Sequence, residues 1–436
     1  MEWFSKKPKS KTTSLYSLII PIILTGSLFG LAAILPGCKE PAQKAELEFW
    51  GVFDDSDIYR SLIEGFNKEF PNIKIKYYKK TYQTYENDLL EAMASGRGPD
   101  IFVMHHTWLP RYQDKIWAAP STLISQKEIQ DNFVDVVTDD FIKDGYISAL
   151  PLSVDTLALY YNKDIFNTMG IPQPPTTWDE FLDDVEKLTI KDERDNIVRA
   201  AAALGTARNI NRSTDILTLL MLQSGAQIVN QQKTKATFNQ EVGNFNPGQR
   251  SLQFYTDFAD LRKSIYTWNT RMDYSIDSFS QGKTAMMLNY SYQLPIIRAK
   301  SPYLNFGIAP MPQTEESTKD VNYANYWGLT VSRNCQSPNQ AWQFIIWLTE
   351  KEKAQRYLEL TKKPTARRDL ILWQKDDSDL GVFAQQALTA YSWYQVDNSS
   401  IEIVLADMIE SVILGQATIR EAVDRAANEV TLLMQR

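Results

Sequence analysis

Hydrophobic and polar positions alternate with two different periods in the first part of the chain. Residues 46–50 and 73–77 alternate apolar and polar side chains, which predicts strands, whereas residues 56–69 and 85–95 repeat apolar side chains at helical spacing. Residues 100–104 form a short apolar run, as in a strand that is covered on both faces. This order predicts a parallel, doubly wound sheet, and ligands collect at the carboxyl ends of the strands in such sheets.

A second patterned stretch, residues 147–181, joins a strand to a helix through a proline-rich spacer. Apolar side chains in residues 157–161 predict the strand, and the three prolines between residues 172 and 175 exclude a helix there. Thr177 and Glu180 then fit a capping box, in which the Thr177 side chain accepts from the amide of Glu180 and the Glu180 side chain accepts from the amide of Thr177. We therefore expect a new helix to begin directly after Thr177.

Helical periodicity returns in the second half of the chain. It predicts helices at residues 214–224 and 251–263, and two more within residues 401–434, on either side of Gly415. The chain contains no internal repeat and no low-complexity tract.

Several of these segments resemble the extracellular solute-binding proteins of ABC importers, in the branch that includes maltose-binding protein. The resemblance covers about residues 46–436 in the correct order. Its motifs are "SGRGPDIFVM" at 95–104, "PLSVDTLALYYNKDIF" and "GIPQPPTTWDEF" within 151–181, "FSQGKTAMMLN" at 279–289, "YANYWGLTVS" at 323–332 and "GQATIREAVDRAANEV" at 415–430.

The resemblance implies a two-lobed α/β fold of the periplasmic-binding-protein (Venus-flytrap) type. Each lobe would be a doubly wound sheet with flanking helices, and two or three crossings of the chain would form the hinge. The segments at 147–181 and 323–332 resemble the first and second crossings. The expected lobes are residues 46–153 with 329–375 and residues 154–328 with 376–436.

The amino terminus has the pattern of a targeting segment. A basic stretch, Lys6–Lys11, precedes a run without charge from Thr12 to Gly37, and Leu35-Pro36-Gly37-Cys38 resembles a bacterial lipobox. Residues 1–38 are expected to be a lipoprotein signal peptide that leaves Cys38 lipidated, or else a retained helical anchor. Residues 39–45 would then tether the protein to the extracytoplasmic face of the cell membrane.

Charge and cysteine content exclude several other classes. The formal net charge is −7, and residues 1–38 carry +3, so the rest of the chain carries −10. An acidic body argues against nucleic acid as a partner. Two His and two Cys argue against a structural zinc site, and we expect no metal and no cofactor. Cys335 is expected to be a small buried hydrophobic side chain rather than a reactive thiol.

Aromatic and polar side chains at strand ends and crossings suggest a binding cleft. Trp and Tyr rings can cover the C–H faces of a sugar, while Asp, Asn, Arg and Gln bond its hydroxyl groups. Phe53 and Asp54 follow the first predicted strand, and His106 and Trp108 follow the third. Asp155 lies in the first crossing, where it could bind a ligand or fix the hinge.

The remaining candidates are implied by the resemblance. Relatives place a cleft loop, a stacking aromatic and a loop of proline and arginine at the positions of Asn209, Tyr292 and Arg367, respectively. Four further stacking candidates lie in the second crossing and before the penultimate predicted helix: Tyr326, Trp327, Trp393 and Tyr394. For any single aromatic, packing in the core remains the alternative.

We expect a monomeric, non-enzymatic receptor that captures a carbohydrate and delivers it to the permease of an ABC importer. A surface glycosidase would need two carboxylates beside the scissile bond, and the sequence contains none of the hydrolase motifs G-x-S-x-G or H-E-x-x-H. A receptor for a peptide, polyamine or oxyanion is the other alternative, because a fold alone does not define the ligand.

Overall fold

The computed structural model describes residues 44–435, which form one compact unit. The predictions for residues 1–38, Cys38 included, and for most of the tether lie outside these residues. The first strand begins at Ala45, one residue before the expected start. Among residues 44–435, no helix combines the length and the apolar character needed to cross a bilayer.

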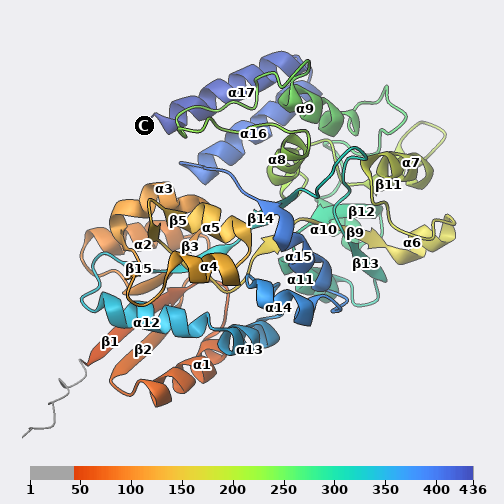
Figure 1. Ribbon diagram of the computed structural model, residues 1–436. Helices are drawn as coiled ribbons and strands as arrows, with labels where there is room; N and C mark the ends of the chain where they lie inside the picture. Colours follow the sequence, from red (N-terminus) through yellow and green to blue (C-terminus); the bar gives the residue numbers. More distant parts are fainter. Residues whose placement is uncertain (1–43, 436) are drawn as a thin grey trace, which may run out of the picture. The chain divides into compact units, whose positions relative to one another are not determined.

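The first sheet has six strands within the described residues, and Figure 1 shows it at the lower left. Its strand order is β2-β1-β3-β15-β4, with β7 paired beside β15. The strands are β1 (Ala45–Gly51), β2 (Ile73–Lys79), β3 (Ile101–His105), β4 (Ile116–Trp117), β7 (Leu150–Pro151) and β15 (Trp327–Ser332). The parallel pairing predicted for β1 with β2 and β3 is confirmed, whereas β15 returns antiparallel to β3.

Helices cover this sheet, and the first two of them follow the helical spacing predicted for residues 56–69 and 85–95. They are α1 (Ser56–Glu69), α2 (Tyr85–Ala94), α12 (Pro338–Leu348) and α13 (Lys351–Thr361). Phe66 of α1 is fully buried, with its ring centroid 5.0 Å from that of Phe344 of α12. The antiparallel strand β15 is followed directly by α12, so a late segment of the chain completes the core begun by the first hundred residues.

The second sheet contains five strands of the described chain, in the order β10-β11-β12-β9-β13. They are β9 (Ala158–Asn162), β10 (Ile190–Lys191), β11 (Ile197–Ala202), β12 (Thr284–Asn289) and β13 (Phe306–Ala309). Strands β11 and β12 are parallel, while β9 runs antiparallel to both of its neighbours. Its helices include α7 (Trp178–Leu188), α8 (Ser213–Gln223), α9 (Pro247–Asp257), α16 (Asn398–Ile413) and α17 (Ile419–Met434).

Two helix starts show how local sequence fixes these elements. The capping box predicted at the start of α7 is present, with Thr177 accepting from the amide of Glu180. The helix predicted at residues 251–263 was misplaced, because it runs from Pro247 to Asp257. Asn246 caps it by accepting from the amide of Gln249, and Pro247 suits the first helical position.

A small three-stranded sheet, β16-β14-β8, accompanies the crossings between the two large sheets. Its strands are β8 (Asp155–Thr156), β14 (Asn322–Asn325) and β16 (Ala390–Tyr391). Strand β8 follows β7 of the first sheet, and β14 precedes β15. The chain therefore passes between the sheets at residues 151–158 and 325–327, and a third passage lies near residue 390.

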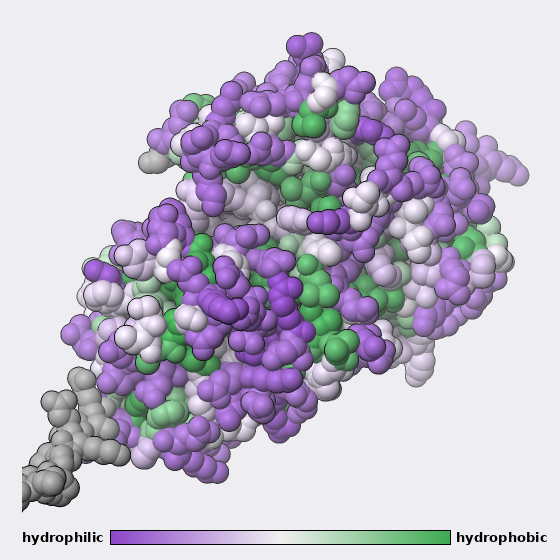
Figure 2. All heavy atoms as spheres, in the orientation of Figure 1, coloured by the Kyte–Doolittle hydropathy of each residue, from purple (hydrophilic) through white to green (hydrophobic). Residues whose placement is uncertain are grey.

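Other helices and strands fill the connections, and Figure 2 shows mainly hydrophilic side chains on the face in view. These elements are α3 (Leu109–Tyr112), α4 (Gln126–Asn132), α5 (Asp135–Phe141), β5 (Ile142–Lys143), β6 (Tyr146–Ile147), α6 (Lys163–Thr168), α10 (Ser275–Ser280), α11 (Leu294–Lys300), α14 (Arg368–Gln374) and α15 (Gly381–Gln386). Short 3-10 turns lie at residues 106–108, 113–115, 291–293 and 387–389.

Candidate ligand-binding site

A pocket of about 790 Å³ is lined by residues associated with both large sheets. On the side of the first sheet, its walls come from the loop after β1, the start of α2, the end of β3 and the loop before α14. On the side of the second sheet, they come from the loop before α8, the turn after β12 and the start of α16. This volume is within the range of sites that hold small molecules.

Aromatic rings form one wall of the pocket. We call Phe53, Tyr82, Trp108 and Trp327 the aromatic wall. Trp327 lies at its centre, with ring centroids 5.3 Å from Phe53, 5.0 Å from Trp108 and 6.3 Å from Tyr82. Phe53 and Tyr82 are 48% and 58% exposed, so their rings face open space instead of filling a core. Such surfaces can cover the apolar face of a flat ligand.

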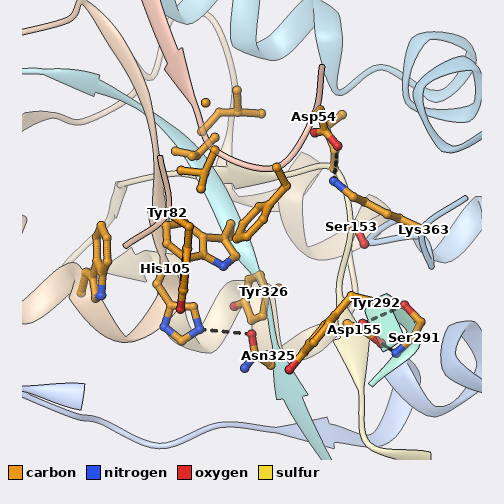
Figure 3. Close-up of a pocket in the computed structure, with 18 of the residues that line it drawn as sticks. Asp54, Tyr82, His105, Ser153, Asp155, Ser291, Tyr292, Asn325, Tyr326 and Lys363 are labelled. Carbon is orange, nitrogen blue, oxygen red and sulfur yellow. Dashed lines mark hydrogen bonds and ion pairs between the residues drawn. The ribbon is translucent and has the colours of Figure 1, made fainter. Parts of the chain in front are cut away.

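Tyr292 contributes an aromatic ring from the second sheet. It belongs to the turn directly after β12 and stacks on Tyr290, with ring centroids 5.7 Å apart. Tyr290 is fully buried, whereas Tyr292 is 44% exposed. In Figure 3, Tyr82 and Tyr292 lie on different sides of the pocket. The pocket therefore has aromatic surface on both of its sides.

Asp54 is held by an ion pair and by hydroxyl groups. Lys363, from the loop before α14, donates to one carboxylate oxygen, as Figure 3 shows, and Tyr357 of α13 donates to the other at 2.6 Å. Asp55, not Asp54, occupies the N-cap position of α1, and its side chain makes no capping bond. Asp54 is therefore positioned by tertiary contacts at the carboxyl end of β1, where a ligand can reach it.

Asp155 lies buried in the first crossing and is fixed by the other side of the pocket. Its carboxylate accepts from the Ser291 hydroxyl at 2.7 Å and from the backbone amides of Ser291 and Thr156 at 3.1 and 2.9 Å (Figure 3). Burial raises the pKa of Asp155 to about 7, although these hydrogen bonds act in the opposite direction. Both roles considered from the sequence, hinge and ligand contact, remain compatible with this position.

His105 supplies a neutral imidazole to the pocket. Its ring nitrogens lie 2.7 Å from the Thr107 hydroxyl and 3.2 Å from the side-chain oxygen of Asn325. Burial lowers the pKa of His105 well below its usual value, so the ring is uncharged at neutral pH. His105 can therefore take part in hydrogen bonds without adding a charge.

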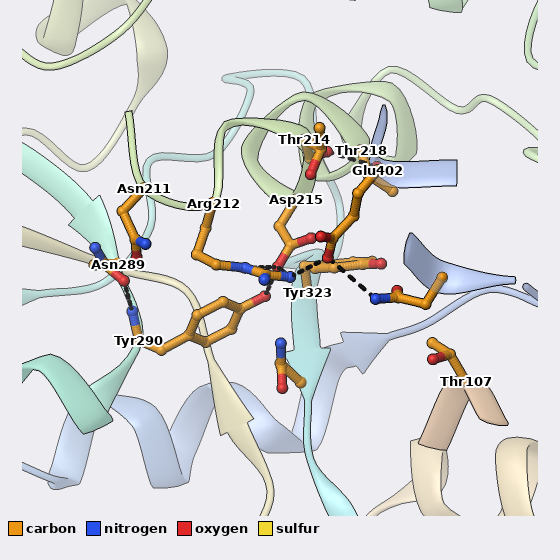
Figure 4. Close-up of polar contacts among 12 residues, drawn as sticks. Thr107, Asn211, Arg212, Thr214, Asp215, Thr218, Asn289, Tyr290, Tyr323 and Glu402 are labelled. Carbon is orange, nitrogen blue, oxygen red and sulfur yellow. Dashed lines mark hydrogen bonds and ion pairs between the residues drawn. The ribbon is translucent and has the colours of Figure 1, made fainter. Parts of the chain in front are cut away.

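Arg212 brings a guanidinium group to the pocket wall, and Figure 4 shows its contacts. One of its terminal nitrogens lies 2.6 Å from Asp215 and 3.0 Å from Glu402, and Tyr290 donates to Asp215 at 2.7 Å. Arg212 itself has a left-handed backbone, with φ +60°, at the position before α8. Non-glycine residues rarely adopt this conformation, so the surrounding ion pairs hold a strained residue in place.

The structure places seven of the twelve candidate residues in the pocket lining. These are Phe53, Asp54, Trp108, Asp155, Tyr292, Tyr326 and Trp327. All of them come from strand ends or from the first two crossings, where the topology brings distant segments of the chain together. Their contact with a ligand remains a prediction.

Five candidates lie outside the lining. His106 is buried and stacks on Tyr326, with parallel rings 4.7 Å apart. Asn209 is turned away to bond the backbone oxygens of Asn269 and Met272, and Arg367 pairs with Asp369. The last two are Trp393, which is buried in the second core, and Tyr394, whose ring lies 5.2 Å from the Lys233 ammonium.

Several lining residues have no clear signal in the sequence. Lys363 stands four residues before Arg367, in the loop that the resemblance indicated, and Arg212 stands three residues after Asn209. Their side chains could be identified only once the directions of these loops were known. Tyr82 and Glu86 flank the start of α2, and Glu402 lies near the start of α16.

The described residues, 44–435, contain no group of three or more His, Cys, Asp or Glu side chains arranged to hold a metal ion. Cys335 is buried there, and burial raises the pKa of its thiol to about 12. This agrees with its expected role as a small hydrophobic side chain.

Comparison with known proteins defines the class. The sequence profile of the family "Bacterial extracellular solute-binding protein" matches residues 51–355, and the chain belongs to this family. A putative binding protein of Brucella abortus is 22% identical over 393 residues, covering 84% of this chain and 88% of the relative. The galactooligosaccharide-binding protein of Bacillus subtilis is 22% identical over 405 residues, covering 89% of each chain.

Solved structures share the fold. The cyclic alpha-maltosyl-1,6-maltose binding protein of Arthrobacter globiformis superposes with a TM-score of 0.76 at 19% identity, covering 90% of this chain and 99% of that one. The predicted two-lobed periplasmic-binding-protein fold is therefore confirmed. Membership of the family also places the folded body outside the cytoplasm.

Proposed function

We propose that the protein is the substrate-binding component of an ABC importer and captures a carbohydrate between two closing lobes. The observation that carries this proposal is the pocket, where aromatic rings from both sides face carboxylate, amide and hydroxyl groups. A sugar ring has C–H faces and a rim of hydroxyl groups, and the lining offers a partner for each. The protein would then deliver the sugar unchanged to the permease subunits.

The relatives support a carbohydrate over the alternatives. Two of the three proteins compared above carry names that specify an oligosaccharide or a maltosyl sugar. Their family consists of binding proteins, which supports capture without catalysis and argues against a surface glycosidase. The pocket volume of about 790 Å³ leaves room for more than one sugar ring.

We propose lobe boundaries from the two apolar cores. One core contains buried residues from 45–154 and from 324–390, and the other contains residues from 157–323 and from 393–430. Residues 380 and 383 instead pack with β9 and β12, in a small third core. These divisions support the boundary near residue 154 between lobes of 46–153 with 329–375 and of 154–328 with 376–436. Ala387 and Ala390 of the first core lie beyond the proposed boundary at 375, which supports a third crossing near residue 390.

Isothermal titration calorimetry tests the function. A panel of malto-, galacto-, arabino- and manno-oligosaccharides should include at least one that binds saturably with one-to-one stoichiometry. The recovered sugar should be chemically unchanged. Hydrolysis of a sugar would favour the glycosidase, and binding confined to peptides, polyamines or oxyanions would favour the other kind of receptor.

Attachment to the membrane is a separate proposal. The basic stretch, the uncharged run and the sequence ending at Cys38 support a lipid-modified Cys38, with a retained helical anchor as the alternative. Mass spectrometry of the protein from its native membrane should show an amino terminus that begins at a lipidated Cys38. An intact Met1 would exclude the lipoprotein and leave the anchor.

A further inference from the structure

The cations of the pocket lining already have acidic partners. Within the described residues the lining contains Lys363 and Arg212 as its lysine and arginine side chains. Lys363 pairs with Asp54, and Arg212 is shared between the carboxylates of Asp215 and Glu402. Each cation is therefore already neutralised by an acidic partner, and an anionic ligand would meet no free positive charge there.

Acidic groups outnumber these cations. The described lining contains four carboxyl groups: Asp54, Glu86, Asp155 and Glu402. The ion-pair partners just behind it, Asp215 and Arg111, add one charge of each sign. If all the carboxyl groups are ionised, the pocket has an excess of two negative charges. If Asp155 alone is protonated, one excess negative charge remains.

We propose that this pocket is a charge filter, which accepts uncharged sugars and excludes sugars that carry a carboxylate, sulfate or phosphate group. The inference rests on the proposed function, because it specifies which carbohydrates the same site takes. An anion entering the pocket would lose water without gaining a free cation, and it would approach carboxylates of the same sign. Sugar hydroxyl groups avoid this cost, because they donate to carboxylates and accept from N–H groups while remaining neutral.

The position of Arg212 makes the filter rigid. Its guanidinium is mostly buried and bonds Asp215 through two nitrogens, at 2.6 and 2.8 Å. Tyr290 fixes Asp215 from the other side. An anion that accepted from its remaining N–H groups would lie beside a positive charge that Asp215 and Glu402 already neutralise. The arrangement therefore offers N–H donors in a fixed direction without offering a free positive charge.

Matched sugars provide the first test, with the full-length protein and calorimetry. Neutral galacto- and manno-oligosaccharides are compared with oligogalacturonate and oligomannuronate of equal length, and maltotriose with its sulfated form. We expect each acidic form to bind about a hundredfold more weakly than its neutral counterpart, or not measurably. An acidic sugar that binds as tightly as its neutral counterpart would overturn the filter and leave the proposed sugar receptor intact. Failure of every sugar, with binding of a peptide or polyamine, would instead remove the proposed function.

A second test needs no ligand. Iodide and caesium quench tryptophan fluorescence, and the difference between the native protein and Trp327→Phe isolates the signal of Trp327 in the aromatic wall. At fixed ionic strength, and relative to free N-acetyltryptophanamide, we expect caesium to quench this signal more efficiently than iodide. Equal access, or better access for iodide, would contradict a negative pocket.

Removing one acidic side chain of the lining tests whether local charge causes the difference in quenching. Glu402→Gln keeps the shape of the side chain while removing its charge, so iodide should quench Trp327 several-fold more efficiently in this variant. Glu429→Gln makes the same change on the exposed face of α17, outside the pocket lining, and should leave quenching unchanged. Equal effects of the two substitutions would show that net charge alone matters and would reject the local filter.

Discussion

At the scale of single residues, Trp327 is the central ring of the aromatic wall. Its ring contacts Phe53, Tyr82, Trp108 and His105, all of which line the pocket. A ligand that covers this ring would bury a large apolar surface of the protein. Large aromatic side chains tend to dominate the free energy of binding.

Replacing Trp327 should therefore weaken binding strongly. We expect Trp327→Ala to reduce affinity for a bound sugar by about 30-fold, or about 2 kcal/mol, as measured by calorimetry. Trp373→Ala removes a tryptophan that is 42% exposed on α14 and does not line the pocket, so its affinity should be unchanged. Equal affinities of the two variants would show that Trp327 does not contact the sugar.

Asp155 should make stability depend on pH. Its pKa is about 7 in the folded protein, above the usual value of 3.8, so the folded state binds this proton more tightly than the unfolded state does. The protonated carboxyl group contributes its full share to the free energy of unfolding below about pH 4. This contribution falls as the pH rises from about 4 to about 7, and the total loss is about 4 kcal/mol.

Asp155→Asn removes this titration. Between pH 4 and pH 7.5, its free energy of unfolding should rise relative to that of the native protein, by up to about 4 kcal/mol, because the native protein alone must ionise a buried carboxyl group. Denaturant titrations at the two pH values measure the difference. A difference between the two proteins that is independent of pH would mean that Asp155 titrates normally.

At the scale of elements, short-range signals place several helices. Thr177 and Thr418 each form a capping box, at the starts of α7 and α17. The two glutamates have lowered pKa values. The amide and hydroxyl of Thr176 and the amide of Thr177 donate to Glu180, and the amide and hydroxyl of Thr418 donate to Glu421. Such a cap works through neighbours in the sequence, so sequence analysis can identify it.

Removal of one cap should have a modest, local cost. Thr177→Ala should lower the free energy of unfolding by about 1 kcal/mol, because the amide of Glu180 loses its acceptor. Thr122→Ala, at an exposed position in a loop, is the matched control and should change stability little. If chemical denaturation gave the same value for both variants, the capping bond would contribute nothing measurable.

Close approach of two elements fixes the second crossing. A Cβ atom on Gly328 of β15 would lie 2.7 Å from the ring of Phe141, and Tyr326 just before it bonds Asp140 of α5 at 2.7 Å. Asp140 also accepts from Ser392, near the third passage between the sheets. Packing and hydrogen bonds thus connect two crossings with α5, and these contacts fix the course of the chain through the hinge.

At the scale of the whole molecule, ligand binding should shift the protein toward a closed state. A ligand favours closure only as far as it binds the closed arrangement more tightly, and this pocket draws its contacts from both sheets. We expect the radius of gyration from small-angle X-ray scattering to decrease on saturation with a bound sugar. Trp327→Ala at the same sugar concentration should show a smaller decrease. An unchanged radius at full occupancy would show that binding does not involve closure.

The sequence predicted much of the fold and part of the site. The rule that ligands gather at the carboxyl ends of strands identified Phe53, Asp54 and Trp108, all of which line the pocket. The same reasoning selected His106, although its neighbour His105 faces the pocket. A shift of one residue at the end of a strand reverses the direction of a side chain, and periodicity does not fix where the strand ends.

Local pattern by itself determined the strands β1 to β3, the helices between them and the capped start of α7, because these depend on residues a few positions apart. Only the tertiary structure decided which charges meet. Lys363 reaches Asp54 across 309 positions, and Arg212 reaches Glu402 across 190. Such pairs depend on how the folded chain brings remote segments together, and no local period records them. The sequence thus defined the class of receptor, while the three-dimensional fold set the charge and shape of its pocket.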